Sequence, residues 1–234
     1  MAALVQVRGL THTYGEDGDR VVALRHVDLT LAPGDRVAVM GRSGSGKTTL
    51  LNVLAGLETP SGGRVEIAGR DLAVATRRER EAHRRSVAGY VWQRPEDGLL
   101  PGLTALENVL APMLGAGGRR WDRLDRALRL LDAMRLGDRR HHLPARLSPE
   151  EIERLAVAVA LANGPRLLLA DELTAGVDWT AATQLLDDLV KALADAGTAA
   201  VIVTHDPRVA RYVDRVLLIS HGVALPVPPR RATR

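Results

Sequence analysis

The 234-residue sequence contains no cysteine and no phenylalanine, and aromatic side chains make up only 3% of it. The absence of cysteine excludes disulfides and thiolate metal sites, and it permits a reducing cytoplasm. The few aromatics, and arginines interleaved with Asp and Glu, provide neither the stacking platform nor the dense basic stripe that nucleic-acid binders use. We therefore expect no nucleic-acid partner, although the formal net charge is +4.

Long hydrophobic runs are missing as well. The longest, residues 155–162, is far short of the ~20 residues that a transmembrane helix needs. The apolar opening is brief, with Arg8 and His12 close behind it, so we also expect no signal peptide. With 46% hydrophobic and 26% charged residues, the composition is that of a folded protein, either one large domain or two small, closely packed ones. We expect attachment to a membrane only through a partner.

The clearest functional pattern lies between residues 37 and 57. Four apolar residues predict a buried strand, the next eight read GRSGSGKT, and the apolar spacing after them predicts a helix to residue 57. This is the phosphate-binding pattern GxxxxGK(S/T) in its strand–loop–helix context. Glycines let successive N–H groups surround anionic oxygens, and the start of a helix favours the same charge. The pattern predicts nucleotide binding by Gly41, Arg42, Ser43, Gly44, Ser45, Gly46, Lys47, Thr48 and Thr49.

Two residues of this loop have individual roles. We expect Lys47 to reach the β- and γ-phosphates and the Thr48 hydroxyl to hold Mg²⁺. The alternative is a glycine-rich turn that matches the pattern by accident. However, Lys47 and Lys191 are the only lysines among 32 basic residues, so a chain that otherwise uses arginine has lysine at this position.

Polar residues follow three further apolar stretches that predict strands: Gln93, the pair Asp171 and Glu172, and His205. Open α/β sheets place their ligands at the carboxyl ends of strands, so we expect these four side chains around the phosphate loop. Asp171 suits a water-mediated contact to Mg²⁺, and Glu172 suits a general base for the water that attacks the γ-phosphate. The alternative is that the acid pair only caps the segment that follows it.

The rest of the chain predicts an α/β fold with additional helices. Residues 4–7 and 21–31 predict N-terminal strands, residues 94–146 predict an insert of loops and helices, and the apolar spacing of residues 122–134 is helical. Residues 223–234 form a basic, Pro- and Arg-rich tail that we expect to be mobile. Tyr14, beside a loop between the first strands, is either part of the core or a residue that stacks on a nucleotide base.

The order and spacing of six motifs resemble those of the ATP-binding-cassette (ABC) ATPases over residues 4–222. The resemblance implies a P-loop NTPase core, in which helices flank a mostly parallel sheet, with an N-terminal antiparallel β subdomain and a helical subdomain at 94–163. It also assigns roles: adenine stacking to Tyr14, Walker A to residues 41–48, Mg²⁺ and partner sensing to Gln93, Walker B to residues 168–171, the catalytic base to Glu172, the D-loop to Asp178 and the switch to His205. Residues 99–109 look like the subgroup that drives lipoprotein-release and macrolide-efflux permeases.

The resemblance implies a function as well. Members of the family bind and hydrolyse ATP with Mg²⁺, dimerise head to tail and drive a transmembrane permease. The chain would then be a cytoplasmic ATPase subunit, peripheral on the inner face of the cell membrane through that permease. The permease selects the transported substance and its direction. Relatives that act in DNA repair or on ribosomes carry coiled-coil inserts or two fused cassettes, for which the interval between Gln93 and Ser148 leaves no room.

One motif departs from the family pattern. The signature, normally LSGGQ, is LSPEE at residues 147–151. In the family the glycines offer N–H groups to the γ-phosphate held by the opposite subunit, whereas Pro149 has no N–H and Glu150 and Glu151 bring negative charge. Ser148, Pro149 and Glu151 instead predict an ordinary helix start with a capping box. Losing one preorganised donor to a developing anion typically lowers the rate ~10²–10³-fold.

We therefore expect an asymmetric pair of ATPase chains. Lys47, Glu172 and His205 are intact, so a partner chain with a normal signature would complete one hydrolytic site and leave a second site that only holds nucleotide. A homodimer would have two damaged sites and hydrolyse ATP slowly. The alternative is a nucleotide-gated regulatory subunit, which binds ATP and dimerises but contributes little hydrolysis.

Overall fold

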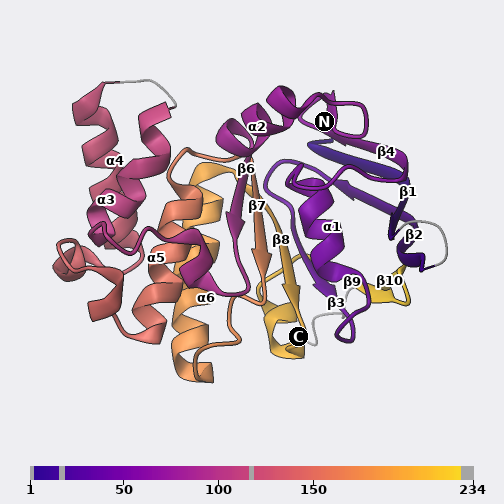
Figure 1. Cartoon of the computed structure of the whole chain (residues 1–234). Coiled ribbons are helices and arrows are strands. Elements are labelled where there is room, and N and C mark those ends of the chain that lie inside the picture. Colours follow the sequence, from indigo (N-terminus) through magenta and orange to yellow (C-terminus); the bar gives the residue numbers. More distant parts are fainter. Residues whose placement is uncertain (1–2, 16–18, 116–118, 228–234) are drawn as a thin grey trace.

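The computed structural model describes residues 3–15, 19–115 and 119–227, and its fold is the predicted α/β class (Figure 1). The core is a six-stranded sheet in the order β10-β9-β3-β8-β7-β6. All neighbouring strands run parallel except β10, which is antiparallel to β9. The strands are β3 (Arg36–Met40), β6 (Ala88–Val91), β7 (Leu167–Asp171), β8 (Ala199–Thr204), β9 (Arg215–Ser220) and β10 (Val223–Val227). The predicted, mostly parallel sheet is therefore confirmed.

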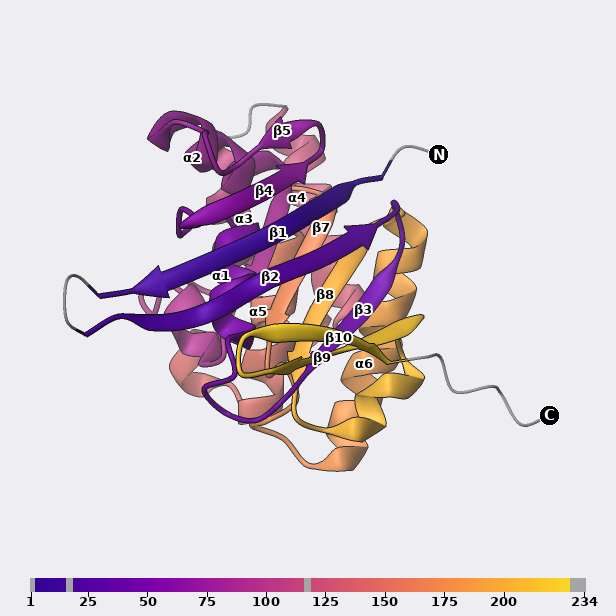
Figure 2. The same ribbon diagram turned by 90° about the vertical axis from the view of Figure 1, so that its right-hand side faces the viewer.

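A second, antiparallel sheet lies across the first, as Figure 2 shows. Its order is β2-β1-β4-β5. The strands are β1 (Val5–Tyr14), β2 (Val21–Leu31), β4 (Gly62–Ile67) and β5 (Arg70–Asp71). The backbone N–H of Arg25 in β2 donates to the Gly222 carbonyl (2.8 Å), so this sheet also contacts the turn between β9 and β10. The predicted N-terminal antiparallel unit is confirmed.

Helix α1 (Lys47–Leu54) packs between the two sheets. Leu50, Leu51 and Leu54 are fully buried in one cluster with side chains from both sheets. Burying a side chain of this size contributes about 1.5–3 kcal/mol relative to exposing it. The helix predicted after the phosphate loop is present, but it ends before residue 57, where Gly56 takes a left-handed conformation (φ 66°) that commonly ends helices.

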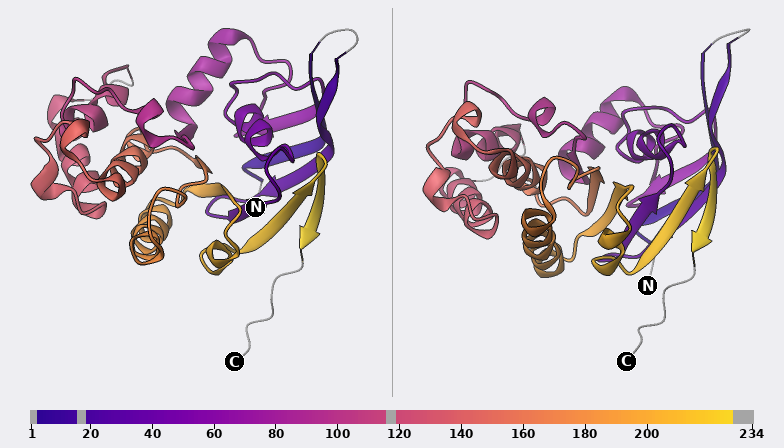
Figure 3. Two further views of the ribbon diagram at one scale, coloured as in Figure 1. Left: turned by 60° about the horizontal axis from the view of Figure 1, so that its bottom comes forward. Right: turned by 90° about the horizontal axis from the view of Figure 1, so that it is seen from below.

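The opposite face of the parallel sheet is covered by helices, and further helices extend away from it (Figures 1 and 3). Alternation along β7 explains this arrangement, because Leu167 and Leu169 join the cluster around α1 while Leu168 and Ala170 join a second cluster under the helices.

Within the described part of the chain, no helix has the length and apolar character needed to span a membrane. The helices are α2 (Arg77–Ser86), α3 (Ala105–Leu110), α4 (Arg120–Ala133), α5 (Pro149–Leu161) and α6 (Trp179–Ala196), with short 3₁₀ turns at η1 (Pro95–Gly98), η2 (Ala111–Gly115), η3 (Gly137–Arg139), η4 (Pro144–Arg146) and η5 (Pro207–Arg211).

The prediction of a mobile tail at residues 223–234 is wrong for its first five residues. Val223–Val227 form β10, which pairs with β9 in a hairpin. The two turn residues, His221 (φ 48°) and Gly222 (φ 79°), are both left-handed, which matches the twist of the flanking strands. The rest of the predicted tail, residues 228–234, lies outside the described residues.

Candidate active site

The phosphate loop joins β3 to α1 and packs tightly against neighbouring strands. A Cβ added at Gly41 would lie 2.2 Å from the Ile219 carbonyl oxygen, and one at Gly46 would lie 2.3 Å from that of Ala23. Gly46 also has a φ of 105°, which other residues rarely adopt. No described side chain caps the first N–H groups of α1. These N–H groups and the positive end of the helix dipole are therefore available to an anion.

Lys47 is a buried cation at the start of α1, with 8% of its surface exposed. Its Nζ donates to the carbonyl oxygens of Gly41 (2.9 Å) and Arg42 (3.0 Å). These two oxygens orient the ammonium group without neutralising its charge, so Lys47 can attract a phosphate.

Thr48 and Asp171 meet at the carboxyl end of β7. The Thr48 hydroxyl donates to Asp171 Oδ2 at 2.8 Å. Burial raises the pKa of Asp171, the Thr48 hydrogen bond partly offsets this rise, and the neighbouring Glu172 adds to it. Hard divalent cations prefer oxygen ligands such as these, and a bound cation would favour the charged form of the carboxylate. The pair therefore fits a Mg²⁺ site.

Glu172 and His205 form a second pair beside the first. Oε2 of Glu172 accepts from the His205 backbone N–H (3.2 Å) and lies 2.8 Å from Nδ1 of the same histidine. Glu172 has a φ of 51°, an uncommon backbone conformation for a residue with a side chain, and its N–H donates to the Val203 carbonyl (2.9 Å). The strand ends of β7 and β8 thus hold the carboxylate in one orientation.

A cavity of about 630 Å³ brings most of the predicted site residues together. The predicted residues on its wall are Tyr14, Ser43, Gly44, Gly46, Lys47, Thr48, Thr49, Gln93, Asp171, Glu172 and His205. Gly41, Arg42 and Ser45 belong to the loop but are not on the wall of the cavity, and neither are Ser148, Pro149, Glu150, Glu151 and Asp178. Asp178 instead caps α6, where its Oδ1 accepts from the N–H groups of Thr180 (2.8 Å) and Ala181 (3.0 Å).

The cavity also has wall residues that the sequence analysis missed. Val21, Val22, Ala23 and Arg25 come from β2, and His221 and Gly222 from the β9–β10 turn. No local pattern marks them, because the strand order alone brings these two segments to the phosphate loop.

Tyr14 lies on the cavity wall at the end of β1. The residue is 41% exposed, while its hydroxyl donates to Glu58 Oε2 (2.6 Å) and lies 3.1 Å from Thr49 Oγ1. Of the two interpretations that the sequence left open, this position on the wall favours contact with a ligand over a place in the core.

The segment at residues 147–151 forms the helix start that the sequence predicts. Ser148 caps α5, and Glu151 completes the capping box through the Ser148 N–H (2.8 Å). Glu151 also contacts Arg139 (2.7 Å), and Glu150 contacts Arg154 (3.0 Å). Burial alone would raise the pKa of Glu151, but Ser148 and Arg139 together lower it. Each carboxylate is therefore paired with an arginine, which reduces the negative charge expected at this helix start.

Glu153 of α5 is a buried acid that the sequence analysis did not single out. It is 3% exposed, and its Oε2 has no hydrogen-bond partner among the described residues. A Cβ at Gly176 would lie 3.1 Å from Oε1, so Glu153 packs against the segment that joins Glu172 to Asp178. Burial, with a smaller contribution from Glu96, raises its pKa from 4.5 to about 8. The sequence contained one signal for this burial, because Glu153 lies on the apolar face of α5.

We expect Glu153→Gln to raise the free energy of unfolding at alkaline pH. The folded-state pKa of about 8 exceeds the unfolded value of 4.5, so the folded protein retains an extra proton between them. Stability from this proton is complete below pH 4.5 and is lost as the pH rises through 8. Glutamine cannot ionise, so the variant should gain roughly 2–4 kcal/mol at high pH, within the limit of ~1.4 kcal/mol per pKa unit.

Urea unfolding of the parent and the variant at several pH values measures this difference. Glu66→Gln, at a half-buried acid of β4 that pairs with Arg64, is the control and should reproduce the pH dependence of the parent. An identical pH dependence for the parent and Glu153→Gln would contradict the prediction.

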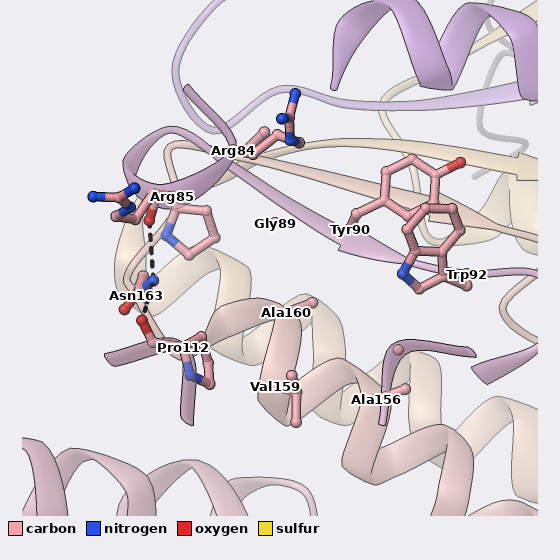
Figure 4. A pocket seen from close by; sticks show the side chains of 13 residues that line it. Arg84, Arg85, Gly89, Tyr90, Trp92, Pro112, Ala156, Val159, Ala160 and Asn163 are labelled. Carbon is pink, nitrogen blue, oxygen red and sulfur yellow. Dashed lines mark hydrogen bonds between the residues drawn. The ribbon is translucent and has the colours of Figure 1, made fainter. Parts of the chain in front are cut away.

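A second cavity, of about 190 Å³, lies between β6 and α5, and we call it the β6–α5 groove (Figure 4). The rings of Tyr90 and Trp92 lie on its β6 side with centroids 4.5 Å apart, and Trp92 is 38% exposed. Across from them, Asn163 donates to the carbonyls of Arg85 (3.0 Å) and Pro112 (3.1 Å). The groove thus separates the edge of the parallel sheet from the helical region.

Comparison with known proteins agrees with this geometry. The ABC transporter family model matches residues 24–175. The chain is 42% identical to the lipoprotein-releasing system ATP-binding protein LolD of Pseudomonas fluorescens, over 94% of this chain and 96% of that protein. It is 44% identical to the macrolide export ATP-binding/permease protein MacB of Rhodopseudomonas palustris, over 94% of this chain but only 33% of that protein.

A solved structure shows the same fold. The dimeric, post-hydrolysis state of the ATP-binding cassette MJ0796, bound to ADP and Pi, is 34% identical with a TM-score of 0.85. The match covers 94% of this chain and 96% of that one.

Proposed function

The chain belongs to the ABC transporter family, and from this premise we propose that it is the ATPase subunit of a transporter and powers a separate membrane permease through ATP-dependent dimerisation. The observation that carries the proposal is the 2.8 Å contact between Thr48 and Asp171, with Glu172 and His205 on the wall of the same cavity. Through the permease, the chain would lie on the inner face of the cell membrane.

The start of α1 binds the phosphates of ATP. The N–H groups of the phosphate loop and of α1 donate to phosphate oxygens, and Lys47 contributes a full positive charge. Thr48, Asp171 and Gln93 would hold Mg²⁺, which, when bound, neutralises charge on the phosphates. Tyr14, on the wall of the same cavity, stacks on the adenine base.

Glu172 acts as the general base. His205 occupies its Oε2, whereas Oε1 has no hydrogen bond within the described residues. Oε1 can therefore accept the proton of the water that attacks the γ-phosphate, while His205 keeps the carboxylate oriented.

We expect Lys47→Ala to weaken MgATP binding roughly ten- to hundredfold, which corresponds to the free energy that a hydrogen bond to a charged group contributes. Equilibrium binding of a fluorescent ATP analogue measures the loss, and Lys191→Ala, the other lysine of the chain, is the control. Unchanged binding and hydrolysis in Lys47→Ala would overturn the proposed nucleotide site.

The permease contact lies at the β6–α5 groove and the segment after it, residues 93–104. Trp92, next to Gln93 in the sequence, provides apolar surface in the groove, and Leu100 (50% exposed) provides it in the segment after the groove. A partner that binds this surface would therefore contact Gln93, which lies just after β6 and lines the nucleotide cavity.

The signature supports pairing with a different ATPase chain. Pro149 cannot donate an N–H, and Glu150 places a carboxylate in the first turn of α5. A partner with a normal signature would complete the site that contains Lys47 and Glu172. ATP turnover of the purified chain, alone and with candidate partners, tests this pairing, and brisk hydrolysis by the lone chain would overturn it.

The same feature favours a second candidate function, a nucleotide-gated regulatory subunit that dimerises on ATP with little hydrolysis of its own. Slow turnover that no partner accelerates, together with ATP-dependent dimerisation, would favour this function over the first.

A further inference from the structure

Glu58, just beyond α1, is the centre of a hydrogen-bond network beside the nucleotide cavity. Its Oε2 accepts from the Tyr14 hydroxyl (2.6 Å) and lies 3.1 Å from Nε2 of His12. Its Oε1 accepts from the Asn52 side-chain amide at 2.9 Å. Both oxygens are thus held by neighbouring side chains, and the Glu58 side chain is only 25% exposed.

This network determines the position of the Tyr14 ring. The hydroxyl is fixed between Glu58 and Thr49 Oγ1 (3.1 Å), and His12 packs edge-on against the ring, with centroids 4.7 Å apart. Burial and the Glu58 hydrogen bond raise the pKa of Tyr14, so the hydroxyl remains a donor. The ring is therefore oriented before a ligand arrives, although 41% of the surface of Tyr14 is exposed.

A second arm of the network reaches the β6–α5 groove. The Tyr90 hydroxyl donates to Asn52 Oδ1 (3.1 Å), and the Tyr90 ring contacts Trp92 (Figure 4). Asn52, Tyr90 and Trp92 also line a small cavity of about 200 Å³, which extends to Thr48 and Asp171. Continuous polar contacts thus join the Tyr14 side of α1 to the groove.

We propose that Glu58 is a positioning residue for the nucleotide base: it holds the Tyr14 ring for stacking and, through Asn52, links that ring to Tyr90 and Trp92 in the groove. The inference rests on the proposed function only in that Tyr14 stacks on the base. Holding a side chain in its bound orientation removes the entropy cost of ordering it, which corresponds to roughly three- to tenfold in affinity.

A comparison of MgATP with magnesium tripolyphosphate distinguishes the positioning of the base from a general effect of Glu58 on α1. Glu58→Ala should weaken MgATP binding roughly three- to tenfold. It should leave the binding of magnesium tripolyphosphate, which has no base, unchanged. Glu58→Gln keeps an oxygen that can accept from Tyr14 and should retain most of the affinity for MgATP. Glu66→Ala, at a half-buried acid of β4 away from the nucleotide cavity, is the control for the loss of a carboxylate.

A double-mutant cycle tests whether Glu58 acts through Tyr14. In a Tyr14→Leu chain, Glu58→Ala should cause no further loss of MgATP affinity. Equal losses for MgATP and tripolyphosphate, or no loss for either, would overturn the proposal. If Tyr14→Leu weakens MgATP binding and Glu58→Ala does not, only the role of Glu58 fails. If the parent chain binds no MgATP, the proposed function itself fails.

The emission of Trp92 tests the second arm. In a chain with Trp121→Phe and Trp179→Phe, saturation with MgATP should change the Trp92 emission, because the Tyr14 ring and Tyr90 share one network. Tyr90→Phe removes only the hydroxyl and should reduce this change. A response that is absent in the parent, or equal with and without the Tyr90 hydroxyl, would overturn the link to the groove.

Discussion

Glu172→Gln should lower the rate of ATP hydrolysis about 10²–10⁴-fold, the range that a positioned general base contributes. Glutamine keeps the size of the side chain, and its oxygen can still accept from the His205 N–H, as Glu172 Oε2 does at 3.2 Å. It cannot accept a proton from the attacking water. We therefore expect MgATP to bind normally and ATP-bound dimers to accumulate, because the step that consumes ATP is blocked.

Steady-state phosphate release measures the rate of hydrolysis, and size-exclusion chromatography with MgATP measures the accumulation of dimers. If the parent chain alone hydrolyses ATP slowly, both are measured with a partner chain that has a normal signature. Glu66→Gln, the same substitution at a carboxylate that is not on the cavity wall, should leave both at the parent level. His205→Ala should cause a smaller loss of rate than Glu172→Gln, since it removes the orienting group and leaves the base. Turnover of Glu172→Gln within tenfold of the parent would exclude Glu172 as the base.

Restoring LSGGQ should raise the turnover of the chain on its own by about 10²–10³-fold, the effect of one regained donor. The variant combines Pro149→Gly, Glu150→Gly and Glu151→Gln. The first change supplies the missing N–H, and the second removes a carboxylate from the start of α5. Glutamine at the third position can still form the capping box that Glu151 makes with Ser148.

The restored signature has a structural cost. Glu150→Gly breaks the contact with Arg154, but Arg154 keeps its 2.7 Å contact with Asp188 and does not become an unpaired buried charge. Glycine near a helix start also lowers helix propensity, by up to ~1 kcal/mol. Thermal unfolding of the variant checks that α5 remains folded.

Two controls make the result specific. Glu151→Gln alone should behave as the parent, and the restored signature combined with Glu172→Gln should again be inactive. If the folded, restored chain hydrolyses ATP no faster than the parent, the signature does not limit hydrolysis, and the argument for an asymmetric pair loses its basis.

Local segments of the sequence were sufficient for much of the fold and site. The strand–loop–helix at residues 37–54 is confirmed because its signals are contiguous: an apolar strand, glycines where a Cβ would clash, and an apolar helix face. The helix start at Ser148 is confirmed for the same reason, since a capping box involves only four consecutive residues.

Signals that depend on distant partners were not available. The prediction for residues 223–227 relied on Pro and Arg content, whereas pairing with β9 made this segment a strand. Likewise, the sequence placed two carboxylates at the signature but could not show that Arg139 and Arg154 neutralise them.

The sequence by itself determined that a nucleotide-binding loop is present and that Asp171, Glu172, Gln93 and His205 end strands near it. Only the tertiary structure decided that Tyr14, Glu58 and Tyr90 belong to one network and that the β9–β10 turn lines the cavity. The physical reason is the separation along the sequence between the residues that interact. Caps and glycine turns are decided within a few residues. Contacts such as Tyr14 with Glu58, 44 positions apart, or Gly222 with Ser45, 177 positions apart, depend on strand order and on which face of α1 each sheet covers.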